Sequence, residues 1–183
     1  MPRIQPIELD QAQPKAKALL EGVHKSLGIT PNIMRTMAQS PATLEAFLSF
    51  GKALSGASLS PQVREQIALT VAGENTCDYC ASAHTAIGAK LGLDTDELAA
   101  SLQGLSRDPK TEAALEFARQ IVVEQGRVSD DDLRRVREAG YTEGEITELV
   151  AVVAQNIFTT YFNHIAETEV DFPRVELPEH QAA

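Results

Sequence analysis

Closely spaced start and stop signals for helices divide most of this chain into short helical segments. Ser40-Pro41 and Ser60-Pro61 each place an N-cap residue before a proline, and Gly28 follows a periodic apolar run. These are typical first and last residues of helices. No run alternates between apolar and polar residues with a period of two, the pattern that indicates a strand. We therefore predict an all-α fold, with helices over residues 15–27, 33–38, 41–54, 61–74, 77–91, 95–102, 110–125, 130–139 and 143–166.

The length and composition of the chain suit a single helical domain. Apolar residues make up 43% of the 183 residues, but aromatic residues only 5%, with no Trp. A chain of this length can bury a sizeable core, which here would rely on Ala, Leu and Val, as in helical bundles. No long Gly-, Ser- or Pro-rich linker divides the sequence. We predict one domain over residues 1–183, with an extended tail over 171–183 that is available to dock on a neighbour.

The charge of the chain excludes several classes of partner. A formal charge of −10 and an isoelectric point near 4.8 argue against nucleic acid and anionic membranes, since both require clustered Lys and Arg. The first residues lack the apolar segment of a signal peptide, and the longest apolar run, 149–154, is too short to span a membrane. We expect a cytoplasmic protein, and in that reducing compartment two cysteines do not serve as a structural crosslink.

One pair of residues recurs at a fixed spacing. Glu65 and His84 lie nineteen positions apart, as do Glu145 and His164, and both pairs bracket an apolar helical stretch. The few identities between the two stretches are compatible with a degenerate internal repeat.

The segment around the two cysteines carries the clearest chemical signal. Cys77, Cys80 and His84 occupy positions i, i+3 and i+7, which lie on one face of a helix. With Asn75 or Thr76 as the N-cap, both cysteines would occupy the first turn, where free backbone N–H groups and the helix dipole stabilise a thiolate. A thiolate reacts with a peroxide to form a sulfenic acid, which a second thiol captures as a disulfide.

Glu65 is a candidate partner for this group. It lies in the helix predicted over 61–74, which is apolar nearly all round between 67 and 72 and should be buried on most sides. A carboxylate that points inward needs a partner, and we expect either His84 or a thiol reached through water. The alternative is an ordinary surface charge, paired with an arginine such as Arg64.

Glu65, Cys77, Cys80 and His84 together form the pattern Glu-x11-Cys-x2-Cys-x3-His. This pattern resembles the signature of the AhpD-like alkylhydroperoxidases, which are part of the carboxymuconolactone decarboxylase superfamily. The segments Leu59-Ser-Pro-Gln-Val-Arg-Glu and Asn163-His-Ile-Ala-Glu-Thr-Glu-Val-Asp-Phe-Pro resemble the peroxidase-related branch. The resemblance covers about residues 27–173, which would form the core of an AhpD-like helical bundle.

The resemblance implies an antioxidant enzyme, a thiol-dependent peroxidase that reduces hydrogen peroxide or small alkyl hydroperoxides without a metal or cofactor. It implies that Cys80 attacks the peroxide, that Cys77 resolves the sulfenic acid, and that Glu65 and His84 form a proton relay. An external dithiol or protein reductant would reset the pair, and a homodimer, trimer or hexamer is expected. The best-studied pattern has a His before the second Cys where this chain has Tyr79, so one imidazole is missing from the relay.

Several other interpretations remain open. Cys77, Cys80 and His84 could belong to a zinc site, although structural sites usually have four ligands, or the cysteines could simply pack in the core. His164 lies among aromatic residues, which favours a core or interface histidine over a catalyst. Tyr79 either donates a hydrogen bond into the site or lines a pocket. A decarboxylase-like lyase would not need the cysteine pair, whereas a non-catalytic redox sensor would need the same reactive thiol.

Overall fold

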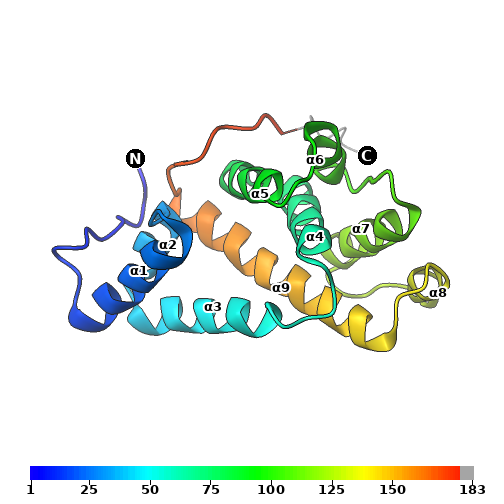
Figure 1. Ribbon diagram of the computed structural model, residues 1–183, viewed down its shortest axis with the longest axis horizontal. Coiled ribbons are helices and arrows are strands. Elements are labelled where there is room, and N and C mark those ends of the chain that lie inside the picture. Colours follow the sequence, from blue (N-terminus) through cyan, green and yellow to red (C-terminus); the bar gives the residue numbers. More distant parts are fainter. Residues whose placement is uncertain (178–183) are drawn as a thin grey trace.

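A computed structural model describes residues 1–177, which form nine α-helices and no strand (Figure 1). Residues 178–183, the last part of the predicted tail, lie outside the described residues. The helices are α1 (Pro14–Leu27), α2 (Asn32–Met37), α3 (Pro41–Leu54), α4 (Pro61–Glu74), α5 (Asp78–Lys90), α6 (Thr95–Ser101), α7 (Pro109–Val123), α8 (Asp130–Glu138) and α9 (Glu143–Ala166). The predicted all-α fold is confirmed. Within residues 1–177, no helix has both the length and the hydropathy that crossing a membrane requires.

Local capping interactions explain where several helices begin and end. The Ser40 hydroxyl accepts the backbone N–H of Thr43, and the Ser60 hydroxyl accepts that of Val63, each just before a proline in the first turn. Gly28 ends α1 in the left-handed conformation, with φ at 76°. Because each cap satisfies a backbone group that the helix leaves unpaired, these signals predict α3 and α4 to the residue.

Helix α4 lies at the centre of the fold, in contact with α5, α6, α7 and α9 (Figure 1). All of its residues from Gln66 to Gly73 are buried. Leu69 and Ala72 belong to a core that includes α1, α2, α3 and α5, whereas Ile67 and Val71 belong to a second core with α7, α8 and α9. The predicted burial of this helix is confirmed, and α4 joins the two cores.

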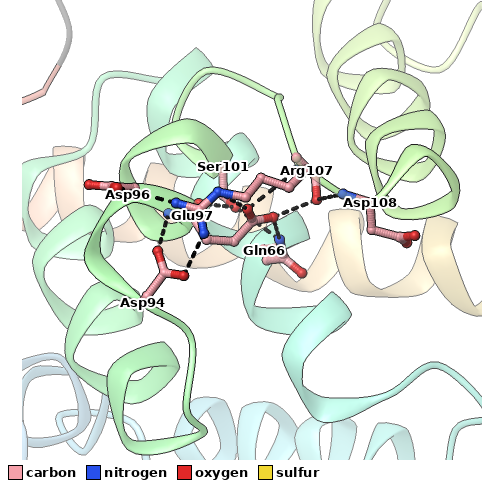
Figure 2. A network of polar contacts seen from close by, with 8 residues as sticks. Gln66, Asp94, Asp96, Glu97, Ser101, Arg107 and Asp108 are labelled. Atoms are coloured by element: carbon pink, nitrogen blue, oxygen red, sulfur yellow. Dashed lines mark hydrogen bonds and ion pairs between the residues drawn. The ribbon is translucent and has the colours of Figure 1, made fainter.

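A polar network fixes α6 against α4 (Figure 2). The side-chain amide of Gln66 donates to the Glu97 carboxylate at 2.8 Å and to the Ser101 hydroxyl at 3.2 Å. The same carboxylate accepts the Ser106 hydroxyl and the backbone N–H of Arg107. A charge that is only 11% exposed is stable here because several donors replace its hydration.

The segment after α9 returns across α5 in an irregular, extended form, shown in red in Figure 1. The Asp171 carboxylate accepts the backbone N–H of Asn32 at 2.8 Å, and the backbone N–H of Val175 donates to the Ser82 hydroxyl at 3.3 Å. Residues 171–177 thus pack on their own chain. Docking on a neighbouring subunit stays a prediction.

The close approach of α4 and α6 predicts a strong effect at Gly73. A Cβ atom there would overlap the backbone carbonyl oxygen of Leu102, which ends α6. We expect Gly73→Ala to lower the free energy of unfolding by about 3 kcal/mol, measured by urea denaturation. Gly22→Ala in α1 is the matched control, because nothing lies within 4 Å of its added methyl group, and it should stabilise the protein by roughly 0.5–1 kcal/mol. Equal stability of the two variants would contradict this account.

Candidate active site

A sharp turn between α4 and α5 positions the two cysteines. Asn75 ends α4, and Thr76 adopts a left-handed conformation with φ at 52°. Cys77 is the N-cap of α5, and its sulfur accepts the backbone N–H of Cys80 at 3.2 Å. The predicted N-cap, Asn75 or Thr76, is therefore wrong, because the left-handed Thr76 reverses the chain and delays the helix until Asp78.

The structure joins Cys77 and Cys80 by a disulfide, with their Cα atoms 5.3 Å apart. Both residues are buried, with exposed fractions of 1% and 4%. Cys80 is the third residue of α5, so its backbone N–H belongs to the unpaired first turn of that helix. Within residues 1–177, no group of three His, Cys, Asp or Glu side chains is arranged to hold a metal ion.

Glu65 and His84 meet across the contact between α4 and α5. The carboxylate lies 2.7 Å from Nδ1 of the imidazole, and each side chain is about one-fifth exposed. The predicted pairing of Glu65 with His84 is confirmed as a contact. The guanidinium of Arg64 instead donates to the backbone carbonyl of Leu54, so the predicted alternative of a surface pair is not seen.

An apolar cavity of about 260 Å³ opens on the side of Cys80 and His84. We call it the Cys80 cavity. Its wall is formed by Leu27, Ile29, Pro31, Ile33, Met34, Phe47, Tyr79, Cys80, Ala83, His84, Ile87, Lys90, Thr159, Asn163 and Phe172. Neither Cys77 nor Glu65 lines it. Glu65 lines a different hollow of about 310 Å³, which His84 also lines, so the imidazole lies between the carboxylate and the cavity.

Asn163 is a site residue that the sequence analysis missed. Its side-chain amide donates to the sulfur of Cys80 at 3.3 Å, and the residue is 5% exposed. Asn156, Thr159, Thr160 and Asn163 are all buried on α9, and their spacing gives a polar stripe on an otherwise apolar helix. That stripe was a readable signal, because buried polar groups at helical spacing need partners.

Tyr79 lines the Cys80 cavity, while its hydroxyl is hydrogen-bonded elsewhere. The hydroxyl accepts the backbone N–H of Ile33 at 3.2 Å, and the ring packs edge-on against Phe172 at 5.8 Å. Burial raises the pKa of Tyr79 well above its ordinary value, and the nearby Asp171 carboxylate raises it further. Of the two predicted roles, this geometry matches a residue that lines the pocket.

His164 lines neither the cavity beside Cys80 nor the hollow beside Glu65. It is exposed near the end of α9, so the predicted core position is wrong, while an interface position stays a prediction. Glu145 caps the start of α9. Nineteen residues of helix separate the two by about 28 Å, so they do not repeat the contact between Glu65 and His84.

The middle of the chain matches the model of a known family. Residues 41–121 match the sequence model of the carboxymuconolactone decarboxylase family, and the match contains Glu65, Cys77, Cys80 and His84. This central segment is therefore similar to the carboxymuconolactone decarboxylase family. The matched region ends before Asn163 and Phe172, so it contains the disulfide and the pair of Glu65 and His84 but only part of the cavity wall.

Solved structures share the fold over nearly the whole chain. The AhpD-core structure of an uncharacterized peroxidase-related protein from Ralstonia eutropha JMP134 is 24% identical, with a TM-score of 0.82, over 93% of this chain and 92% of that one. The debrominase Bmp8, bound to 2,3,4-tribromopyrrole, is 20% identical, with a TM-score of 0.79, over 92% and 91% of the two chains. The uncharacterized protein YdfG of Bacillus subtilis (strain 168) is 28% identical over 121 residues, 63% of this chain and 81% of that protein.

Tyr79→Phe tests the burial of the phenol. The folded protein keeps this proton at a pH where the unfolded chain, with the ordinary pKa of 10.0, releases it. The stability that depends on it is therefore full below about pH 10 and is lost as the pH rises, by up to about 1.4 kcal/mol per pH unit. In urea denaturation above about pH 10, we expect the variant to lose stability less steeply than the wild type. Tyr161→Phe, at an exposed position, should keep the wild-type slope, and identical slopes for all three proteins would contradict the burial argument.

Asn163→Leu tests the amide contact with Cys80. In the reduced protein, loss of a hydrogen bond to a thiolate should raise the pKa of the Cys80 thiol, because such bonds contribute about 1.5–3 kcal/mol. We expect alkylation of Cys80 by iodoacetamide at neutral pH to slow roughly ten-fold, followed by mass spectrometry across a pH series. Asn156→Leu is the matched control, since that amide donates to the carbonyl of Val152. A pH profile that Asn163→Leu leaves unchanged would exclude the amide from the site.

Proposed function

We propose that this protein is a thiol-dependent peroxidase that reduces hydrogen peroxide or alkyl hydroperoxides with Cys80 and Cys77. The observation that carries the proposal is the cavity that Cys80 and His84 share, with a second sulfur bonded to the first and a carboxylate bonded to the imidazole. A peroxide in that cavity meets a nucleophile and a proton donor together. These are the two groups that cleavage of an O–O bond requires.

In the proposed cycle, the Cys80 thiolate attacks one peroxide oxygen. The S–O bond forms as the O–O bond breaks, and His84 protonates the departing alkoxide or hydroxide while Glu65 holds the ring and stabilises its charged form. The sulfur of the Cys77 thiol then attacks the sulfenic sulfur of Cys80, and its proton joins the departing hydroxide as water, which gives the disulfide of the structure. An external dithiol supplies the two electrons and two protons that restore both thiols.

The surface of α9 supports the further proposal of a homo-oligomer. Phe158, Tyr161 and Ile165 are 42%, 55% and 64% exposed on that helix, and exposed apolar groups of this kind are typical of subunit interfaces. A disulfide that cycles between two states also suits the reducing cytoplasm, where permanent disulfides are rare.

Reductive dehalogenation is a second candidate function. The Cys80 cavity is mainly apolar, and the debrominase Bmp8 has the same fold. Two thiols can convert a carbon–halogen bond to carbon–hydrogen, with release of a hydrogen halide and formation of one disulfide, so the electrons balance. Release of bromide from a bromopyrrole, at a rate above that of peroxide turnover, would favour this function over the first.

Substitution of the site residues tests the peroxidase. With dithiothreitol as reductant, we expect Cys80→Ser to abolish removal of cumene hydroperoxide and Cys77→Ser to stop turnover after a single sulfenic acid has formed. His84→Gln should slow the peroxide step by about 10²- to 10⁴-fold, as loss of a general acid does. His24→Gln, on the surface of α1, is the matched control and should have wild-type activity. Wild-type turnover by Cys80→Ser would refute the mechanism, and an activity that survives loss of both cysteines would favour a lyase.

A further inference from the structure

The disulfide separates two openings. Cys80 lines the Cys80 cavity, whereas Cys77 lines a hollow of about 510 Å³ that Cys80 does not line. We call this the Cys77 hollow. Tyr79 and Asn163 line both openings, and the returning tail supplies Phe172 to one and Val170 to the other. The two cysteines of one disulfide thus line different openings.

We infer that the Cys77 hollow is the binding site of the reductant, a small dithiol that attacks the sulfur of Cys77. This inference rests on the proposed function and assigns one of its steps to a second site. A thiolate attacks a disulfide in line with the S–S bond, on the side opposite the sulfur that leaves. From the Cys77 hollow, that approach makes Cys80 the leaving sulfur.

The site stabilises the thiolates that this reaction forms. When the donor sulfur bonds to Cys77, the electron pair of the broken bond stays on Cys80, which receives the N–H of Asn163 at 3.3 Å. The second donor thiolate then attacks the donor sulfur that is bound to Cys77. Cys77 leaves as a thiolate at the start of α5, where the backbone N–H of Cys80 donates to it at 3.2 Å. The donor has then lost two electrons and leaves as its intramolecular disulfide.

The walls of the hollow favour a slim donor over a protein surface. Cys77 is 1% exposed, so a folded oxidoreductase with its cysteine on a flat face would not reach the sulfur, whereas a small dithiol can enter. Two polar atoms in this wall, Oδ1 of Asn163 and Oγ1 of Thr168, are buried and without a hydrogen-bond partner among the described residues. Buried acceptors of this kind need a partner, and both belong to residues that an entering thiol would contact.

The reduction step can be measured without any peroxide. Oxidised protein is mixed with dithiothreitol, and free thiols are alkylated and counted by mass over time. We expect Thr168→Trp, which fills the Cys77 hollow, to slow reduction at least ten-fold. Ile87→Trp, which fills the Cys80 cavity, should slow only the reaction of the reduced protein with cumene hydroperoxide. Val123→Trp, at an exposed position outside both openings, should change neither rate. Slower reduction in Ile87→Trp with a normal rate in Thr168→Trp would overturn the inference.

A second measurement needs no substitution that could disturb folding. Oxidised wild-type protein is treated with excess 2-mercaptoethanol, quenched with acid and alkylated, and the mixed disulfide is located by peptide mass. We expect the adduct on Cys77 and the alkyl group on Cys80, and the reverse pattern, or equal amounts of both, would overturn the inference. The outcome is separable from the proposed function, because a protein that gives the Cys77 adduct but consumes no peroxide would refute the peroxidase and leave the reductant site standing.

Discussion

Helix α4 passes through the middle of the molecule, and the burial of its residues from Gln66 to Gly73 constrains every element around it. A helix surrounded by others can carry polar side chains only where a partner meets them. Glu65 and Gln66 are consecutive residues of α4, and each has such a partner. Their side chains point in different directions, because neighbours on a helix are about 100° apart. Gln66 donates to the Glu97 network on α6, and Glu65 reaches His84 on α5. The first contact fixes the helix, and that rigidity supports the second, which touches the site.

The position of the disulfide follows from the same packing. Because α4 and α5 lie against each other, the turn between them must be short, and the left-handed Thr76 reverses the chain within it. This turn places Cys77 outside the first turn of α5 and Cys80 inside it. The two sulfurs therefore differ in surroundings although only two residues separate them, and this difference underlies their separate roles in the proposed cycle.

The sequence predicted the parts of this structure that local rules determine. Serine caps followed by proline predicted α3 and α4, and the spacing of Glu65 and His84 led to a contact that the structure contains. The N-cap of α5 was missed because a non-glycine residue in the left-handed conformation leaves no composition signal. Asn163 was missed because its partner lies 83 positions away, and a contact of that range depends on tertiary packing. The hydrogen bond between the Tyr79 hydroxyl and the backbone of Ile33 in α2 spans 46 positions. It also depends on tertiary packing and could not be predicted from local sequence.

The wall of the Cys80 cavity comes from three distant parts of the chain. Leu27 to Met34 precede the segment matched to the superfamily, and Asn163 and Phe172 follow it, whereas Cys80 and His84 lie within it. Cys80 and His84 thus lie in a different part of the sequence from most of the other residues that line this cavity. A substitution near either end of this chain can therefore reshape the cavity while the disulfide and the imidazole keep their positions.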